Sequence, residues 1–220
     1  MFEFSQASLL SLFSEYAYRP EYVYTLIILF MFASSFGLPI PEELVLITAG
    51  LVAYIAKDTV NFPPPTPDAI GVDVTVLAIV CFLAVFLSDT IVYLIGKYFG
   101  ARLIKTAFFR EKLNGNVFNK VNEWFNNYGG YACGFFRFIP GLRFAGHMSC
   151  GLMGIPLSKF MLIDGLAALI SVPTQVYFVA TYGDVVLEKF REFKIFILIL
   201  LVLILIVFIF KKFKSSRIGV

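Results

Sequence analysis

Charged residues are scarce in this sequence. Asp, Glu, Lys and Arg together make up 15% of the chain, whereas soluble domains usually contain about 25%. A fraction this small argues against an intrinsically disordered chain and against a nucleic-acid-binding surface. The net charge of +3 is also too small to indicate a polyanionic partner, so we expect no nucleic acid among the partners.

Histidine and cysteine are rarer still. His147 is the single histidine, which excludes metal sites built from several histidines and proton relays that pass between histidines. Cys81, Cys133 and Cys150 are scattered and form neither a CxxC pair nor a disulfide framework, so we interpret them as small apolar packing residues. The sequence therefore predicts no metal site and no cofactor.

Apolar residues dominate the chain instead. They make up 59% of it, against roughly 45–50% in soluble domains, and this composition predicts an all-α polytopic membrane protein. Two stretches, Ile70–Gly96 and Phe160–Tyr182, are long enough to span the bilayer as helices. The first ends in Gly96 and Gly100, whose GxxxG spacing indicates close helix packing. Asp73, near the start of that span, is interpreted as a solvated residue.

The flanking segments predict how the chain lies in the membrane. Residues 1–20 lack the positive charges of a cleavable signal peptide and have near-helical apolar spacing, which predicts an amphipathic segment on the membrane surface. The basic segment 97–127 is expected in the cytoplasm by the positive-inside rule, with an interfacial helix over residues 117–128. Residues 184–210 predict a lipid-facing helix, and the basic tail 211–220 places the C-terminus in the cytoplasm.

Two further apolar stretches are broken in the middle. In the first, Tyr22–Phe36 and Leu44–Ala56 are each too short to span, and Gly37–Pro41 interrupts them just before Glu42 and Glu43. The second, residues 131–154, is interrupted by polar residues and by a Pro-Gly pair. Irregular backbone at membrane depth persists only where protein or a water-filled cavity covers it. Both stretches therefore predict re-entrant hairpins.

The two broken stretches form an internal repeat. Ile40-Pro41 precedes Ala49-Gly50-Leu51, and Ile139-Pro140 precedes Cys150-Gly151-Leu152. One long span and the cytoplasmic segment separate the two, so we expect the hairpins to enter the membrane from opposite faces. Inverted repeats of discontinuous helices are typical of secondary transporters. Residues 21–183 are therefore predicted to form a transport domain.

Several ionisable residues fall in or between these apolar stretches, and five of them are candidates for one site: Glu42, Glu43, Asp89, Arg137 and Arg143. Placing such a residue at the bilayer centre costs at least about 2.5–3.5 kcal/mol, so it usually faces a cavity or an opposite charge. If the hairpin tips meet, the five charges converge, and the planar donor fork of arginine suits bidentate binding of phosphate. The expected ligand is an anionic head group, with the acidic residues as candidates for carrying a proton.

Alternatives stay open for several of these residues. The arginines either bind the substrate directly or only neutralise Glu43 and Asp89 to hold the hairpins together. Glu42 and Glu43 cannot both be deeply buried and charged, and we expect Glu43 to be the buried one. His147 is either an interfacial or packing residue or part of the transport pathway, and Asp164 is either structural or lines the pore.

Three sequence motifs cover the hairpins and the first span. The longest is Phe136-Arg137-Phe138-Ile139-Pro140-Gly141-Leu142-Arg143, followed by Gly151, Met153 and Phe160. The others are Pro41-Glu42-Glu43 with Ala49-Gly50, and Ser88-Asp89 with Tyr93, Gly96-Lys97 and Gly100. Together they resemble the motifs of the DedA family of membrane proteins, whose domain is also called the VTT or SNARE-associated domain.

This resemblance implies two inverted re-entrant hairpins in a small helical bundle that translocates lipids across the cytoplasmic membrane. The lipid would be undecaprenyl phosphate or a phospholipid such as phosphatidylethanolamine. The implied substrate-binding residues are Arg137, Arg143, Glu43 and Asp89. The implied candidates for proton coupling are Glu42, Glu43 and Asp89, and those for structural motif positions are Pro41, Pro140, Gly141 and Gly151. Some family members linked to proton-dependent transport have an acidic residue where Ser34, Ser35 and Phe36 stand here, so proton coupling does not carry over directly.

Other functions compete with lipid translocation. The same residues would suit a proton-coupled carrier for a small ion. A lipid phosphatase would need a histidine with catalytic partners, which a single histidine supplies poorly, and a purely structural role is the last alternative. We expect a transporter rather than an enzyme, in the cytoplasmic (inner) membrane, with a phosphate-bearing lipid and protons as partners. Whether it forms a homodimer is left open.

Overall fold

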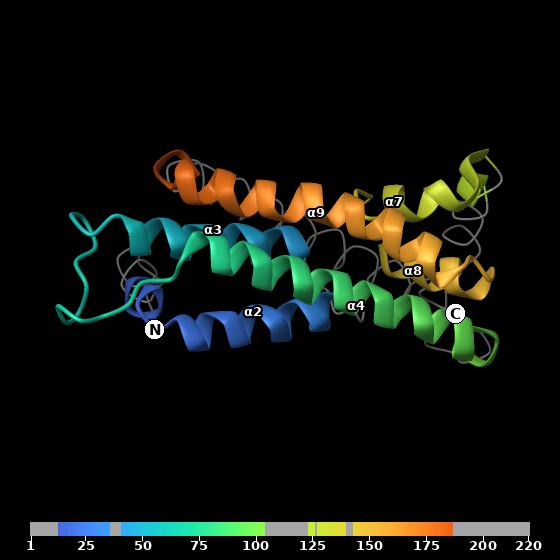
Figure 1. Ribbon diagram of the computed structural model, residues 1–220, viewed down its shortest axis with the longest axis horizontal. Coiled ribbons are helices and arrows are strands. Elements are labelled where there is room, and N and C mark those ends of the chain that lie inside the picture. Colours follow the sequence, from blue (N-terminus) through green and yellow to red (C-terminus); the bar gives the residue numbers. More distant parts are fainter. Residues whose placement is uncertain (1–12, 36–40, 104–122, 126, 140–142, 187–220) are drawn as a thin grey trace, which may run out of the picture. The chain divides into compact units, whose positions relative to one another are not determined.

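The computed structural model describes residues 13–35, 41–103, 123–125, 127–139 and 143–186. Within these ranges the regular structure is helical and contains no strand, which confirms the all-α prediction. The helices are α2 Pro20–Ser35, α3 Glu42–Lys57, α4 Val74–Leu103, the short 3₁₀ helix η1 Gly129–Tyr131, α7 Ala132–Phe136, α8 Arg143–Leu152 and α9 Leu157–Thr181 (Figure 1).

The chain divides into two compact units, residues 1–181 and residues 182–220. The first contains all the helices named above. Several predicted segments lie largely or wholly outside the described residues: the amphipathic segment 1–20, the interfacial helix 117–128, the C-terminal helix 184–210 and the tail 211–220. They stay predictions.

Two helices are long and apolar enough to cross a membrane: Val74–Gly100 within α4, and α9. The first begins four residues later than predicted. Its start is set by Asp73, whose carboxylate Oδ1 accepts hydrogen bonds from the backbone N–H groups of Thr75 and Val76, both at 2.9 Å. Asp73 is exposed, as expected, but it also caps the helix, because its oxygen satisfies N–H groups that have no partner inside the helix.

The first broken stretch consists of α2 and α3, which run in opposite directions (Figure 1). Each has 16 residues, or roughly 24 Å of helix at about 1.5 Å per residue. That is shorter than the roughly 30 Å of bilayer hydrocarbon.

After α3, the Asp58 carboxylate accepts hydrogen bonds from the side-chain amide and the backbone N–H of Asn61. These hydrogen bonds hold the pKa of Asp58 below its ordinary value.

The second broken stretch consists of α7 and α8. Arg137 directly follows α7 as its C-cap residue, and Arg143 is the first residue of α8. Helix α8 packs very closely against α4. A Cβ added at Gly96 would lie only 2.0 Å from the Met148 carbonyl oxygen. Likewise, a Cβ at Gly151 would lie 2.0 Å from the Tyr93 carbonyl oxygen. The close packing indicated by the GxxxG spacing is therefore confirmed, and it occurs within one chain.

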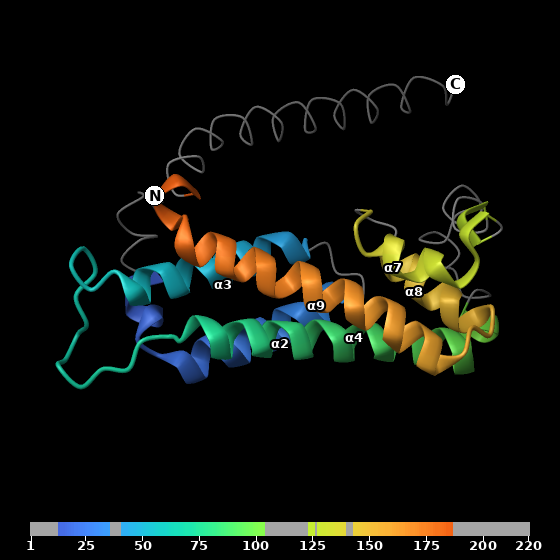
Figure 2. The ribbon, with the colours of Figure 1, turned by 45° about the horizontal axis from the view of Figure 1, so that its top comes forward.

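The elements are arranged along α4. Figures 1 and 2 show α2 beside one half of α4 and α8 beside the other half, with α3 next to α9. Buried apolar side chains of the described residues form three groups: Val85 belongs to the first, Tyr93 and Phe160 belong to the second, and a small third group joins α4 and α8. Asp89 lies one helical turn from both Val85 and Tyr93, and Asp164 lies one turn from Phe160. A polar layer thus lies between the group that contains Val85 and the group that contains Tyr93 and Phe160.

Candidate functional site

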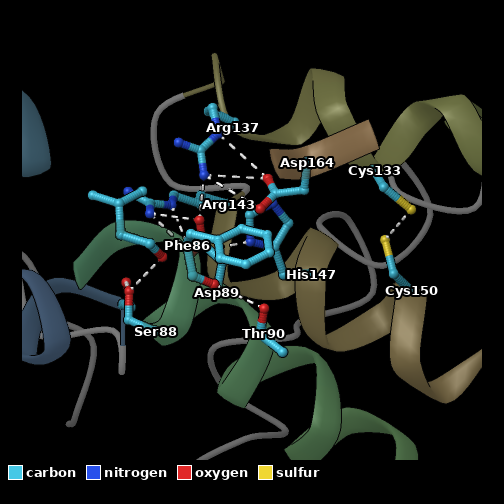
Figure 3. Close-up of polar contacts among 12 residues, drawn as sticks. Phe86, Ser88, Asp89, Thr90, Cys133, Arg137, Arg143, His147, Cys150 and Asp164 are labelled. Atoms are coloured by element: carbon cyan, nitrogen blue, oxygen red, sulfur yellow. Dashed lines mark hydrogen bonds and ion pairs between the residues drawn. The ribbon is translucent and has the colours of Figure 1, made fainter. Parts of the chain in front are cut away.

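Asp89 of α4 is the centre of the polar layer (Figure 3). Its side chain is 1% exposed. Arg143 donates to it through Nε, 3.1 Å from Oδ1, and through Nη2, 2.8 Å from each carboxylate oxygen. Arg137 pairs with the same carboxylate through Nη2. One carboxylate therefore accepts charge-assisted hydrogen bonds from both arginines of the second hairpin, the strong kind of protein hydrogen bond.

Arg137 also contacts a second carboxylate, that of Asp164 on α9. Its Nε lies 3.3 Å from Asp164 Oδ1, and its Nη2 lies 3.2 Å from Oδ1 and 3.4 Å from Oδ2. Both side chains are almost wholly buried, at 4% and 0% exposed. Arg137 therefore ties α4 to α9, the two helices that are long enough to cross the membrane.

The first hairpin joins this cluster through Glu42. Its carboxylate pairs with Arg143 Nη1, so Arg143 bridges α3 and α4. Glu43, by contrast, is exposed, and within the described ranges no ion pair joins it to either arginine. The prediction that Glu43 would be the buried carboxylate was wrong. In α3, Glu42 shares a face with the buried Val45 and Leu46 three and four residues later, whereas Glu43 is rotated away from that face by one helical step.

His147 lies inside the cluster and is fully buried. Its Nδ1 lies 3.3 Å from Asp89 Oδ1, and its Nε2 lies 3.4 Å from Asp164 Oδ1. The edge of the ring meets Phe160, with the ring centroids 5.4 Å apart. His147 is therefore not an interfacial residue, and it contacts the same two carboxylates as Arg137.

The structure thus brings together four of the predicted residues and adds two. Glu42, Asp89, Arg137 and Arg143 converge, Glu43 does not, and Asp164 and His147 complete the cluster. The sequence had marked both added residues as ionisable groups within apolar stretches, which is the feature that identifies such sites. It did not show which way they face.

The predicted structural positions have mixed outcomes. Pro41 is exposed and immediately precedes α3. Gly151 packs against the α4 backbone, as described above. Pro140 and Gly141 lie outside the described residues.

Beside the cluster, the hydroxyls of Ser35 and Ser88 lie 2.7 Å apart. Because Ser88 donates its hydrogen to the Val85 carbonyl at 2.8 Å, Ser35 is the donor between the two hydroxyls.

The ion pairs leave one guanidinium nitrogen without a partner in the described part of the chain. Arg137 Nη1 is buried and has no hydrogen-bond partner within the described part of the chain. An unpaired buried donor costs about 1–3 kcal/mol, and more when it is charged. The neutralising interpretation of the arginines accounts for their other contacts, but it does not account for this nitrogen, which is free to bind an acceptor oxygen from a ligand.

A metal ion is a second candidate occupant of this layer. Oxygen and nitrogen atoms of Asp89, His147 and Asp164 lie within 4.8 Å of one another, close enough to share a cation. However, Arg137 and Arg143 already contact the two carboxylates. Two guanidinium charges would repel a metal cation at these positions, and we therefore assign no metal to the site.

Comparison with known proteins identifies the family. Residues 38–181 match the VTT domain, which is well over half of the chain. The chain belongs to the VTT domain family, the DedA family. This match spans all six residues of the cluster, from Glu42 to Asp164, so the polar layer lies wholly within the VTT domain.

Relatives of this VTT domain protein are named as membrane proteins. It is 28% identical over 158 residues to an uncharacterized membrane protein of Haemophilus influenzae, covering 71% of this chain and 69% of that protein. It is 28% identical over 174 residues to an inner membrane protein of Borreliella burgdorferi, covering 77% and 71%. It is 28% identical over 135 residues to the uncharacterized membrane protein YbfM of Bacillus subtilis, covering 61% and 73%. No solved structure matches the chain.

Proposed function

We propose that this VTT domain protein is a lipid translocase that moves a phosphate-bearing lipid between the two leaflets of the cytoplasmic membrane, and that it is a transporter rather than an enzyme. The observation that carries the proposal is the unpartnered Nη1 of Arg137, buried beside a second arginine in the middle of a membrane domain. A phosphate offers several acceptor oxygens in the geometry that suits guanidinium groups.

The two arginines have different access to a ligand. The Arg143 side chain is 15% exposed and that of Arg137 is 4% exposed. A head group would therefore meet Arg143 first. Its phosphate oxygens would then replace the carboxylate oxygens of Glu42 and Asp89 as partners of this arginine. When the phosphate leaves, the ion pairs between the carboxylates and the arginines form again. This competition keeps the arginines neutralised in both states, which avoids the cost of a lone buried charge.

The arrangement of short helices supports the predicted inverted re-entrant hairpins. α2 and α3 lie along one half of α4, and α7 and α8 lie at the other half (Figures 1 and 2). Each break is followed by a charged residue of the cluster, Glu42 after the first and Arg143 after the second, and these two residues pair. Sites between discontinuous helices near the bilayer midplane are typical of secondary transporters.

The lipid tail would stay in the bilayer, beside the apolar outer surface of the helices. Large exposed apolar side chains lie along α2, α4 and α9, and they include Leu29, Ile79, Leu87, Leu162 and Ile170. We propose undecaprenyl phosphate as the substrate and a phospholipid of the phosphatidylethanolamine type as the alternative, because both present a phosphate to the arginines. In this proposal the C-terminal tail lies in the cytoplasm.

The test is a leaflet-exchange assay in proteoliposomes. Fluorescent phospholipid and labelled undecaprenyl phosphate are supplied separately, and a membrane-impermeant reagent reports the outer leaflet. Wild-type protein should accelerate the exchange of at least one lipid, and Arg143→Ala should slow it by at least about tenfold, which corresponds to about 1.4 kcal/mol. Arg19→Ala is the matched control, because Arg19 is exposed and its contacts, an ion pair with Glu15 and a cation–π contact with Tyr22, lie outside the cluster.

Three results would overturn this proposal. Exchange rates equal to those of protein-free liposomes would exclude a translocase for the lipids tested. Ion flux without lipid movement would support the small-ion carrier. Release of free phosphate from the lipid would support a phosphatase.

A further inference from the structure

His147 is placed so that each of its two ring nitrogens faces a carboxylate. Nδ1 lies 3.3 Å from Asp89 Oδ1, and Nε2 lies 3.4 Å from Asp164 Oδ1. Neither nitrogen has a hydrogen-bond partner elsewhere in the described part of the chain. A neutral imidazole has one N–H and one lone pair, so in the neutral form one lone pair would point at a carboxylate oxygen. The imidazolium form presents an N–H to both.

The net charge of the cluster also favours the imidazolium form of His147. His147 contacts Asp89 of α4 and Asp164 of α9, and the other charged groups of the cluster are Glu42 of α3, Arg137 at the end of α7 and Arg143 of its own helix. Three carboxylates thus face two guanidinium groups, which leaves one buried negative charge uncompensated. A buried charge without a partner is strongly unfavourable, so one further positive charge is required.

We take that charge to be a proton on the imidazole, because the ring lies between two of the carboxylates. Asp89 already contacts two guanidinium groups and Asp164 contacts one. The ring nitrogens of His147 have no such partner, and each faces a carboxylate oxygen.

We infer that His147 is a proton-binding site, held as imidazolium between Asp89 and Asp164, and that its charge is what lets the arginines release these carboxylates and bind a phosphate. The inference rests on the proposed function for its second half. Imidazolium stays beside the two carboxylates when the guanidinium groups turn to the ligand, so the carboxylates are never left without a positive partner. His147 does not touch the ligand and is a positioning residue.

The sign of the pH effect follows. With His147 protonated the cluster is neutral, and with His147 deprotonated it carries one net negative charge that repels an anion. Binding of an anionic head group should therefore weaken as pH rises through the range in which His147 loses its proton. For linkage to one proton, the affinity falls about tenfold per pH unit above that range.

The first experiment reads the protonation of His147 without any assay of transport. Because the chain contains a single histidine, protein labelled with ¹⁵N-histidine and carrying a histidine-free affinity tag gives NMR signals from this residue alone. In ligand-free protein at pH 7, both ring nitrogens should carry a proton. One protonated and one bare nitrogen would overturn the inference, whether or not lipids are moved.

The second experiment measures the binding of dihexyl phosphate by calorimetry between pH 5.5 and 9. This diester is chosen because it lacks the second titrating proton of a phosphate monoester. Above the pH at which the wild-type His147 loses its proton, the wild type should lose affinity by about tenfold per pH unit. His147→Gln should bind at least about tenfold more weakly at pH 6, with no pH dependence. A purely structural role would lower affinity in the variant but leave the pH slope unchanged, and that result would overturn the inference.

The two experiments separate the inference from the proposed function. If both ring nitrogens are protonated but no lipid changes leaflet, the proton site stands and the translocase proposal fails. If lipid changes leaflet in the wild type but the imidazole is neutral at pH 7, the translocase proposal stands and the proton site fails. Tighter binding of the diester at high pH would contradict the proton site directly.

Discussion

Arg143, the first residue of α8, forms an ion pair with Glu42, the first residue of α3. The two residues are 101 positions apart in the sequence, and each follows a break in an apolar stretch. Their contact joins the two halves of the internal repeat at one point. The polar layer is therefore assembled from both hairpins and both long helices, and no single segment contains the site.

The pairing distinguishes the two adjacent glutamates. Glu42→Gln removes the partner of Arg143 Nη1, whereas Glu43→Gln changes an exposed side chain. A hydrogen bond to a charged group contributes about 1.5–3 kcal/mol, so Glu42→Gln should lower the unfolding temperature in detergent and alter leaflet exchange. Glu43→Gln should change the stability by less than about 0.5 kcal/mol. Equal effects of the two variants would contradict the placement of Glu42.

Asp89 is expected to be the most sensitive carboxylate of the domain. Asp89→Asn weakens contacts of both Arg137 and Arg143, and breaking a buried pair by removing one partner costs about 3–5 kcal/mol. Asp73→Asn on the same helix is the control, because asparagine also caps helices well. Thermal unfolding of both variants should show a large loss for Asp89→Asn and almost none for Asp73→Asn. A stable, fully active Asp89→Asn protein would argue against the cluster.

The contact between α4 and α8 can be tested with glycine substitutions. A Cβ at Gly96 would lie 2.0 Å from the Met148 carbonyl oxygen, which belongs to the backbone and cannot move aside. At Gly130 the nearest atom, 2.8 Å away, is Cε at the end of the flexible Lys159 side chain. Overpacking costs typically about 1–3 kcal/mol, so Gly96→Ala should destabilise the protein clearly more than Gly130→Ala. The reverse order in a thermal unfolding series would contradict the helix packing.

The packing of α7 against α8 can be tested by cross-linking. Cys133 and Cys150 are both buried, and their Sγ atoms lie 2.6 Å apart (Figure 3). Treatment with the membrane-permeant oxidant diamide should join them in a disulfide, which removes two alkylatable thiols per chain and leaves Cys81 reactive after denaturation. Cys133→Ser should retain both remaining thiols. Oxidised wild-type protein that alkylates at all three cysteines would show that α7 and α8 are not packed in this way.

Composition and motifs predicted much of this molecule. The apolar content predicted an all-helical membrane protein, the GxxxG spacing predicted close packing at Gly96, and the charged residues of the broken stretches predicted a cluster around Asp89. These predictions depend on local composition and spacing, which the sequence displays directly.

The errors arose where tertiary packing sets the rotation of a helix. Glu42 and Glu43 are adjacent at the start of α3, and only the packing of that helix decides which of them faces Arg143. Asp164 and His147 were recognised as ionisable but not placed, because the faces that α8 and α9 present to α4 depend on contacts between segments far apart in sequence. Helix α4 begins four residues later than predicted because Asp73 caps it.

The most direct test of the central claim measures whether a lipid phosphate touches the two buried arginines. Solid-state NMR on protein labelled with ¹⁵N-arginine, in membranes containing the transported lipid, detects dipolar coupling between guanidinium nitrogens and ³¹P. The proposed site predicts such coupling in the wild type, its reduction in Arg143→Lys, and its loss in the double variant Arg137→Lys, Arg143→Lys. Coupling that is unchanged in the double variant, or absent in a wild-type protein that moves the lipid, would contradict the proposed site.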